Sequence, residues 1–296
     1  MRFGVVQIAD GLPGRGLEFV AETAACLEDL GFDSYWAPDH LVFFDEFTSK
    51  YPHSDDGTFG FKKDQGLLEP IMVLQAAAAA TSRIRIGTSV EIVTVRHPVE
   101  RSKHIVTLDH FSKGRFDYGV GIGWMREEYD AVSVPWERRG VRADEYLQAM
   151  KALWTQNRAS YDGEFVSFSD VVAFPKPFQD PHPPILVGGI TRAALRRSAV
   201  HGNGWYGWKL TVEELADALV VLDEELEAVG RTREGFRIVM GMPHYGDHDG
   251  LAEYVAAIGD LGVDEFVLGL SVPRSGVQSF LETYASTLSI TPHTAS

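Results

Sequence analysis

The chain has 296 residues, 45% hydrophobic and 23% charged, a composition that can bury a large core as ordinary globular proteins do. A formal net charge of −15 argues against nucleic acid or an anionic membrane as a general partner. Cys26 is the only cysteine, and no stretch approaches the ~18 uninterrupted apolar residues of a membrane helix, so we expect a cytoplasmic protein without a disulfide.

Short apolar strands alternate with helical patterns through the first half of the chain. Strands are expected at Phe3–Ile8, Ser34–Ala37, within residues 81–95 and at Arg115–Val120. The spacing of apolar residues predicts helices over residues 17–30, from Pro70 through the alanine run 76–80, and over Pro98–Phe111. Gly31 follows the first helix, at a position where a glycine commonly ends a helix.

The second half repeats this rhythm and adds a hairpin. Residues 157–183 lack the regular alternation of strands and helices, and Asp162-Gly163 within them predicts a hairpin turn. Strands are expected at Pro184–Val187, Trp205–Tyr206, Phe236–Met240 and Glu265–Leu268. Helices are expected at Arg142–Trp154, Arg192–His201, Glu213–Val229, Leu251–Leu261 and Gln278–Leu288.

Eight strands, most followed by a helix, predict the fold class. Apolar strands without polar alternation indicate a parallel sheet that helices cover. We therefore expect an α/β fold in which residues 1–296 form a single (β/α)8 TIM barrel domain, with an extended loop over residues 42–68 after strand two and the hairpin excursion in mid-chain. The run Gly119–Gly123 has the wrong glycine spacing for a dinucleotide-binding fold.

Asp39 and His40 directly follow the second expected strand. In such barrels the active-site groups project from the carboxyl ends of the strands, so His40 is placed to reach the barrel mouth. The alternative is that His40 caps a turn or fills a polar niche of the core. His97 has two similar readings, the mouth of the barrel or the cap of the helix that Pro98 opens, and the cap is favoured.

A second candidate site lies between a strand and a helix at Gly188-Gly189. Glycines expose backbone N–H groups, and the helix that begins near Ile190 directs its positive dipole end to the same place. Arg192 lies in the first turn of that helix and is the favoured side-chain contributor. This is the best local anion site of the sequence, while Lys209 is more simply explained as an exposed lysine.

Several ordered blocks of the sequence carry a family resemblance. They include SYWAPDH, ATSRIRIGTSVEIVTVRHP, GVGIGWMREEYDAVSVPWERRGVRADEY, PHPPILVGG and GNGWY. Together they resemble the luciferase-like superfamily of flavin and deazaflavin oxidoreductases, and more narrowly its members that use coenzyme F420. The resemblance implies a homodimeric (β/α)8 barrel with the cofactor across the mouth.

The resemblance also implies roles for individual residues. Asp39 and His40 match an Asp-His pair beside the cofactor, and Ser89 and Val90 match a bulge with a non-proline cis peptide under the ring system. The resemblance further implies that Gly188 and Gly189 approach the cofactor phosphate. Cofactor contacts are accordingly expected from Asp39, His40, Ser89, Val90, Gly188, Gly189, Ile190 and Arg192.

One position departs from the sugar-phosphate dehydrogenase branch of this superfamily. That branch has a glutamate directly after Gly-x-Gly, where this chain has Trp124, so sugar-phosphate oxidation is placed in doubt. Trp124 is expected either to line the substrate pocket or to pack on the barrel rim. Loop 42–68 is rich in aromatic residues, and we interpret it as a wall of the substrate pocket or as a dimer contact. Phe43 is the residue of this loop that we expect at the substrate pocket.

These observations lead to one main functional hypothesis and three alternatives. We expect an F420-dependent oxidoreductase that transfers a hydride between the deazaflavin and a small organic substrate, with His40 as the proton donor or acceptor. The alternatives are an FMN-dependent luciferase-like monooxygenase, a non-catalytic flavin- or F420-binding protein, and a metal-dependent barrel hydrolase. No metal site is expected, because the first strand ends in Gln7 and Asp10 rather than in paired histidines. Neither the substrate nor the direction of hydride transfer follows from the sequence.

Overall fold

The computed structural model describes residues 1–54, 56–60, 66–244, 246 and 248–292, so residues 55 and 61–65 of the long loop lie outside the described residues. Its strands are β1 (Arg2–Gln7), β2 (Ser34–Ala37), β3 (Arg85–Thr88), β4 (Glu91–Ile92), β5 (Phe116–Gly121), β6 (Ala159–Asp162), β7 (Ser167–Val171), β8 (Ile185–Gly188), β9 (Gly204–Trp208), β10 (Arg237–Pro243) and β11 (Glu265–Leu270). Its helices are α1 (Leu17–Leu30), α2 (Pro70–Ala80), the 3-10 helix η1 (Val93–Val95), α3 (Pro98–Phe111), α4 (Arg126–Ala131), α5 (Arg139–Thr155), α6 (Arg192–His201), α7 (Val212–Ala228), α8 (His248–Asp260) and α9 (Val277–Thr287).

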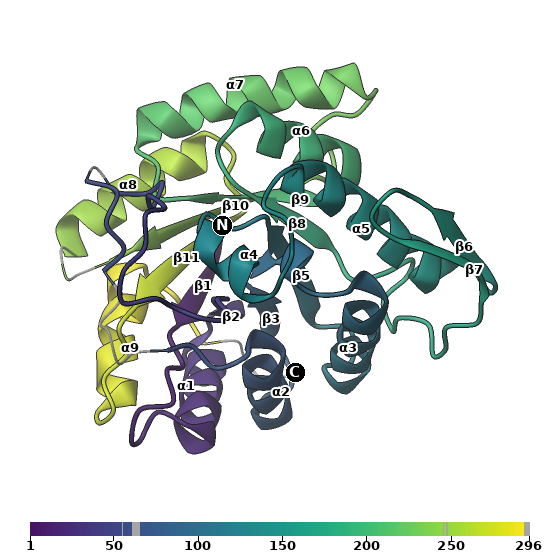
Figure 1. Ribbon diagram of the computed structural model, residues 1–296. Helices are drawn as coiled ribbons and strands as arrows, with labels where there is room; N and C mark the ends of the chain where they lie inside the picture. Colours follow the sequence, from purple (N-terminus) through teal and green to yellow (C-terminus); the bar gives the residue numbers. More distant parts are fainter. Residues whose placement is uncertain (55, 61–65, 245, 247, 293–296) are drawn as a thin grey trace.

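Eight parallel strands close into a barrel, and the helices surround it (Figure 1). The strands follow one another around the barrel in the order β1, β2, β3, β5, β8, β9, β10 and β11, which pairs again with β1. Because all these strands are parallel, their carboxyl ends and the loops that follow them meet at one end of the barrel. The predicted (β/α)8 fold is confirmed.

Local sequence explains where most elements begin and end. All four residues of β2 are buried, because apolar side chains occupy both faces of the strand. Gly31 ends α1 in the left-handed conformation, with φ of 92°. His97 caps α3 by accepting a hydrogen bond from the Val99 amide, in agreement with the favoured prediction. Two elements differ from the prediction. Helix α5 begins at Arg139 instead of Arg142, and the short helix α4 was not predicted, because it carries no strong periodicity of its own.

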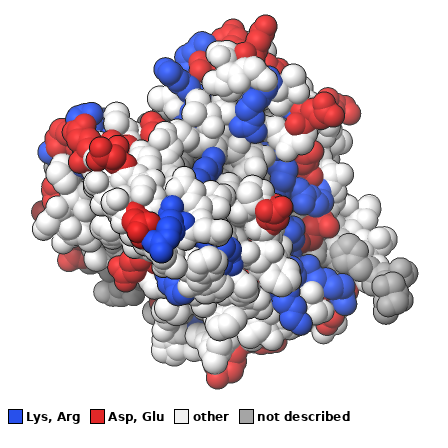
Figure 2. All heavy atoms as spheres, turned by 90° about the vertical axis from the view of Figure 1, so that its right-hand side faces the viewer, with Lys and Arg blue, Asp and Glu red and all other residues white. Residues whose placement is uncertain are grey.

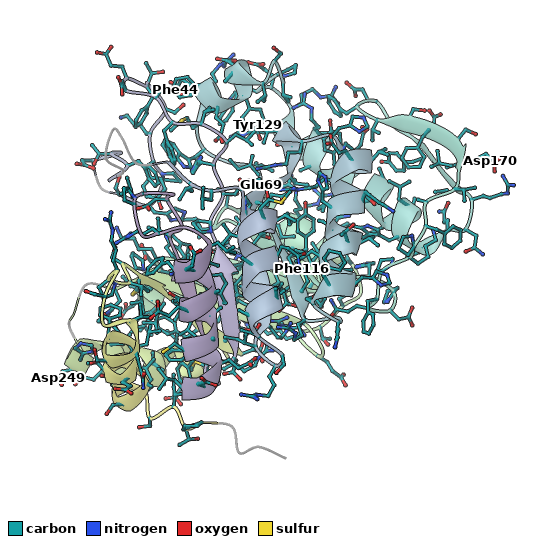
Figure 3. All side chains as sticks on the ribbon, turned by 90° about the horizontal axis from the view of Figure 1, so that it is seen from below. Phe44, Glu69, Phe116, Tyr129, Asp170 and Asp249 are labelled. Atoms are coloured by element: carbon teal, nitrogen blue, oxygen red, sulfur yellow. The ribbon has the colours of Figure 1, made fainter. Side chains whose placement is uncertain are left out.

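The mid-chain excursion is the predicted hairpin. Strands β6 and β7 pair antiparallel, and the Gly163 amide closes the turn on the Val166 carbonyl. The hairpin projects from the side of the barrel (Figure 1), and Asp170 lies out on it in Figure 3. In the same view Phe44 of the long loop and Tyr129 of α4 lie at one end of the molecule. The excursion therefore decorates the barrel away from its mouth.

Charged side chains fill the amino-terminal end of the barrel. Asp117 on β5 binds Arg85 on β3 at 2.6 Å and Arg237 on β10 at 2.8 Å, and Arg237 also binds Glu265 on β11 at 2.8 Å. Burial alone would raise the pKa of Asp117, but Arg237 and Arg85 outweigh burial and lower it. The pair between Arg237 on β10 and Asp117 on β5 joins strands that are not neighbours, so it crosses the interior at this end of the barrel.

The surface is charged and mixed in sign. Figure 2 shows acidic and basic side chains interspersed over the face that carries α3 and α5 in Figure 1. Among the described residues, no helix combines the length and the apolar character needed to cross a bilayer.

Candidate functional site

A cavity of about 570 Å³ opens at the carboxyl end of the barrel. Every strand of the closed barrel contributes to its wall, either at its last residues or directly after them. The lining residues are Val6, Ile8, Pro38, Asp39, His40, Tyr51, His53, Ser54, Thr58, Phe59, Gly60, Leu67, Ser89, Val90, Ile92, Gly123, Trp124, Gly188, Gly189, Tyr206, Trp208, Lys209, Pro243, Gly269, Leu270 and Ser271. This is the place and the size expected of a small-molecule site in a barrel enzyme.

His40 projects into this cavity from the end of β2, and both of its ring nitrogens have partners. Its Nδ1 lies 2.8 Å from Oε2 of Glu128, whose side chain is fully buried. The Trp124 indole donates from Nε1 to His40 Nε2 over 3.3 Å. A carboxylate can only accept and an indole N–H can only donate, so neutral His40 carries its proton on Nδ1. Its Nε2 is the accepting nitrogen, and the donor to it, Trp124, lines the same cavity.

Asp39 has a different role from its neighbour. Its carboxylate accepts both ends of the Arg96 guanidinium at 2.7 Å, and it also accepts the Ile92 amide at 2.9 Å. Asp39 lines the cavity, but none of its hydrogen bonds among the described residues is to His40, because adjacent residues of an extended chain point opposite ways. These contacts favour a role for Asp39 in supporting the loops after β2 and β3 rather than in orienting His40.

Ser89 and Val90 lie between β3 and β4 and line the cavity. The peptide bond that joins them is cis, as the family resemblance implies. Ser89 Oγ donates to the Tyr206 hydroxyl on β9 over 2.9 Å. The Val90 side chain packs against Gly188, where an added Cβ would stand only 2.9 Å from Val90 Cγ2. The two residues form a shelf that packs against the end of β8.

The glycine pair also lines the cavity, whereas the arginine after it does not. Gly189 has φ of 112°, a conformation that other residues adopt only under strain. Helix α6 spans Arg192–His201, the range predicted for it, and Thr191 caps it. The guanidinium of Arg192 is 61% exposed and binds Glu225 at 2.7 Å and Glu224 at 2.9 Å on the α7 side. Gly188 and Gly189 are therefore at the site, while Ile190 and Arg192 are outside its wall.

The long loop supplies an aromatic wall around His40. Phe59 and Tyr51 line the cavity, and their ring centroids are 4.8 Å apart. Phe43 lies behind them, with its ring 4.9 Å from the His40 ring and stacked on Phe59 at 5.8 Å. Trp124 lies 5.3 Å from both Phe59 and Tyr51. Together, the side chains of His40, Phe43, Tyr51, Phe59 and Trp124 are called the aromatic box below.

Helix α4 holds this loop through two adjacent carboxylates. Glu128 accepts the Leu41 amide at 2.5 Å in addition to its bond with His40. Glu127 accepts the Thr48 amide at 2.6 Å and the Ser49 hydroxyl at 2.7 Å. Slight burial tends to raise the pKa of Glu127, but the hydrogen bonds from Ser49 and Thr48 prevail and lower it to about 2. The loop is therefore tied to the same helix that orients His40.

Two site residues were missed or undervalued by the sequence reasoning. Glu128 was not singled out, although it follows Met125 by three residues and precedes Tyr129, and all three are buried. That spacing was the available signal of an inward helix face. Lys209 is exposed, as the sequence indicates, and it also lines the cavity and donates to the His53 carbonyl at 2.7 Å. Burial, with a smaller effect of Lys209, lowers the pKa of His53.

Comparison with known proteins adds family and fold. A family profile described as luciferase-like monooxygenase matches residues 1–272. An uncharacterised protein of Mycobacterium tuberculosis is 36% identical over 251 residues, which cover 84% of this chain and 86% of that one. An FMNH2-dependent dimethylsulfone monooxygenase of Pseudomonas putida is 35% identical over 141 residues, or 47% of this chain and 38% of the relative.

A solved structure extends the likeness to nearly the full length. The coenzyme F420-dependent tetrahydromethanopterin reductase of Methanopyrus kandleri has a TM-score of 0.75 and 15% identity, with 97% of this chain and 98% of that chain covered. At that identity the likeness shows a shared fold. The family profile and the mycobacterial relative go further, and they show that this chain belongs to the luciferase-like monooxygenase family.

Proposed function

We propose that the protein is an F420-dependent oxidoreductase that transfers a hydride between the deazaflavin and a small organic substrate. The observation that carries this proposal is the His40 ring, which lines the cavity, is held at Nδ1 by buried Glu128 and accepts from Trp124 at Nε2. A histidine fixed in this way can take a proton from a substrate hydroxyl and return it to a carbonyl near neutral pH. Glu128 keeps the ring in the accepting tautomer and stabilises it when it becomes charged.

The residues of the mouth fit a cofactor with a ring and a phosphate. Ser89 and Val90 provide a shelf, and the absence of a side chain at Gly188 lets the β8 backbone lie close to it, since a Cβ on Gly188 would crowd Val90 at 2.9 Å. The backbone at the glycines would hold a phosphate next to the start of α6, with Ile190 beside it. When bound, F420 would supply the hydride acceptor or donor. Of the predicted contacts, those from Asp39 and Arg192 have the least geometric support, because both side chains hold ion pairs.

A second candidate is an FMN-dependent monooxygenase. It is favoured by the 35% identity to the Pseudomonas putida enzyme, which uses FMNH2, over 141 residues. The same shelf and glycine pair suit either cofactor, because both carry a phosphate and a flat ring system. The two candidates differ in the use of oxygen.

Binding and turnover distinguish these candidates. Calorimetric titration of the purified protein with oxidised F420 and with FMN is expected to show tighter binding of F420. Tighter binding of FMN together with oxygen consumption in the presence of reduced FMN would replace the proposal with the second candidate. His40→Ala is expected to lower F420-dependent turnover by roughly 10²–10⁴-fold while F420 still binds. His104→Ala on α3, outside the cavity wall, is the matched control and should keep full activity.

A further inference from the structure

The aromatic box presents a hydrogen-bond donor and an acceptor side by side. The acceptor is Nε2 of His40, since Nδ1 is committed to Glu128 at 2.8 Å. The donor is Nε1–H of Trp124, which lies 3.3 Å from that Nε2. An alcohol group has the complementary pair, one hydrogen to donate and lone pairs that accept. A substrate oxygen that enters between the two nitrogens would replace their single mutual bond with two bonds of its own.

The rings around this pair determine what can be attached to that oxygen. Phe59 lies 5.7 Å from His40 and 5.3 Å from Trp124 between ring centroids, and Tyr51 lies 5.3 Å from Trp124. Aromatic walls bind apolar and aromatic groups by burial and edge-to-face contact. The aromatic box contains no lysine or arginine that would compensate a carboxylate or phosphate for its lost hydration, and Lys209 of the same cavity donates to the His53 carbonyl at 2.7 Å.

We propose that Trp124 is a further catalytic residue and that the substrate is a neutral alcohol, or the matching carbonyl compound, with an apolar body. This inference rests on the proposed function. Trp124 holds the reacting oxygen through its indole N–H, while His40 exchanges the proton. The position therefore has a catalytic task even though it lacks a carboxylate.

The chemistry balances with the cofactor already proposed. In the oxidation direction the hydroxyl proton passes to His40 Nε2, and the carbinol hydrogen leaves with its electron pair to oxidised F420. The O–H and C–H bonds break, the C=O π bond forms, and the substrate loses two electrons and two hydrogens in total. Negative charge develops on the oxygen as its proton departs. An indole N–H stabilises that charge and, unlike a carboxylate, cannot compete for the proton.

The first test uses the protein without cofactor. The chain has six tryptophans, so a spectrum of the protein with 15N-labelled indoles is simple, and Trp124→Phe identifies the Trp124 signal by its loss. Titration with acetophenone, 1-phenylethanol, cyclohexanone or cyclohexanol is expected to shift that N–H signal saturably, and benzoate is expected not to. Trp136→Phe carries the same chemical change outside the cavity wall and should leave the response intact. A Trp124 signal that none of the four neutral compounds moves would overturn the inference.

The second test uses the F420-loaded enzyme. Trp124→Phe keeps an aromatic ring and removes only the donor, so kcat for a neutral alcohol is expected to fall about tenfold to a hundredfold with KM changed much less. Unchanged kcat in this variant, or a preference of the wild type for an anionic alcohol, would contradict the assignment. Failure of F420 to bind would defeat the proposed function alone, since the indole titration does not involve the cofactor. Binding of F420 with an unmoved indole signal would defeat only the role of Trp124.

Discussion

Replacing Glu128 with glutamine is the most informative single change to this site. The glutamate side chain is fully buried and accepts two hydrogen bonds, from His40 Nδ1 at 2.8 Å and from the Leu41 amide at 2.5 Å. Glutamine has nearly the same shape but offers one oxygen and one NH2 group in place of two accepting oxygens. One of the two donors must therefore face another donor.

The size of the effect follows from these contacts. An unsatisfied buried donor costs about 1–3 kcal/mol, so the unfolding free energy of Glu128→Gln should fall by that amount. If the amide oxygen stays with Leu41, the NH2 group turns to His40 and moves the ring proton to Nε2. The Nε2 would then face the Trp124 N–H as a donor and would no longer accept a substrate proton. Turnover should fall by up to roughly 10²–10⁴-fold, the usual contribution of a positioned general base.

Two measurements check this reasoning. Urea denaturation gives the change in stability, and long-range 1H–15N spectra of the histidine rings report the tautomer without any substrate. The wild type is expected to show His40 protonated at Nδ1, and Glu128→Gln to show it protonated at Nε2. Glu137→Gln removes a carboxylate that is 64% exposed and should change neither property. A Glu128→Gln protein with the wild-type tautomer, stability and turnover would refute the proposed role of Glu128.

Three further predictions concern the support of the site. Asp39→Asn should lower the unfolding free energy by about 3–5 kcal/mol in urea denaturation, because it removes the buried carboxylate that binds the partly buried Arg96 guanidinium. The His40 tautomer should stay as in the wild type, and a changed tautomer would mean that Asp39 orients the histidine. Gly188→Ala should weaken F420 binding about tenfold in calorimetry, since the new Cβ lies 2.9 Å from Val90. The control Gly16→Ala places its Cβ where nothing lies within 4 Å and should bind F420 normally. Equal binding by both variants would show that Gly188 is not part of the cofactor site. Because the pKa of Glu127 is lowered to about 2, its tie to the loop should be complete above about pH 4.5 and weaken as the pH falls towards 2. The protection of the Thr48 and Ser49 amides from hydrogen exchange, relative to the intrinsic rate at each pH, should therefore fall over that range in the wild type, and protection that already matches Glu127→Gln at pH 5 would contradict the tie.

The positions of several site residues could be predicted because barrel geometry converts sequence order into place. His40 follows β2 and Gly188 ends β8, and the parallel strands of a closed barrel all end at the same mouth. Both residues accordingly line the cavity. Arg192 shows the limit of this reasoning, since it begins the helix after the glycines but its side chain turns to carboxylates at Glu224 and Glu225.

The sequence by itself determined the architecture, because the periodicity of apolar residues and the glycines and prolines at element ends are local signals. Only the tertiary structure decided which side chains meet at the mouth. Glu128 is 88 positions from His40, and Arg96 is 57 from Asp39. Such pairs depend on how closure of the barrel brings separate loops together, and on which polar atoms are then buried and must find partners. No periodicity within a single element contains that information, so the accepting nitrogen of His40 could be identified only from the folded chain.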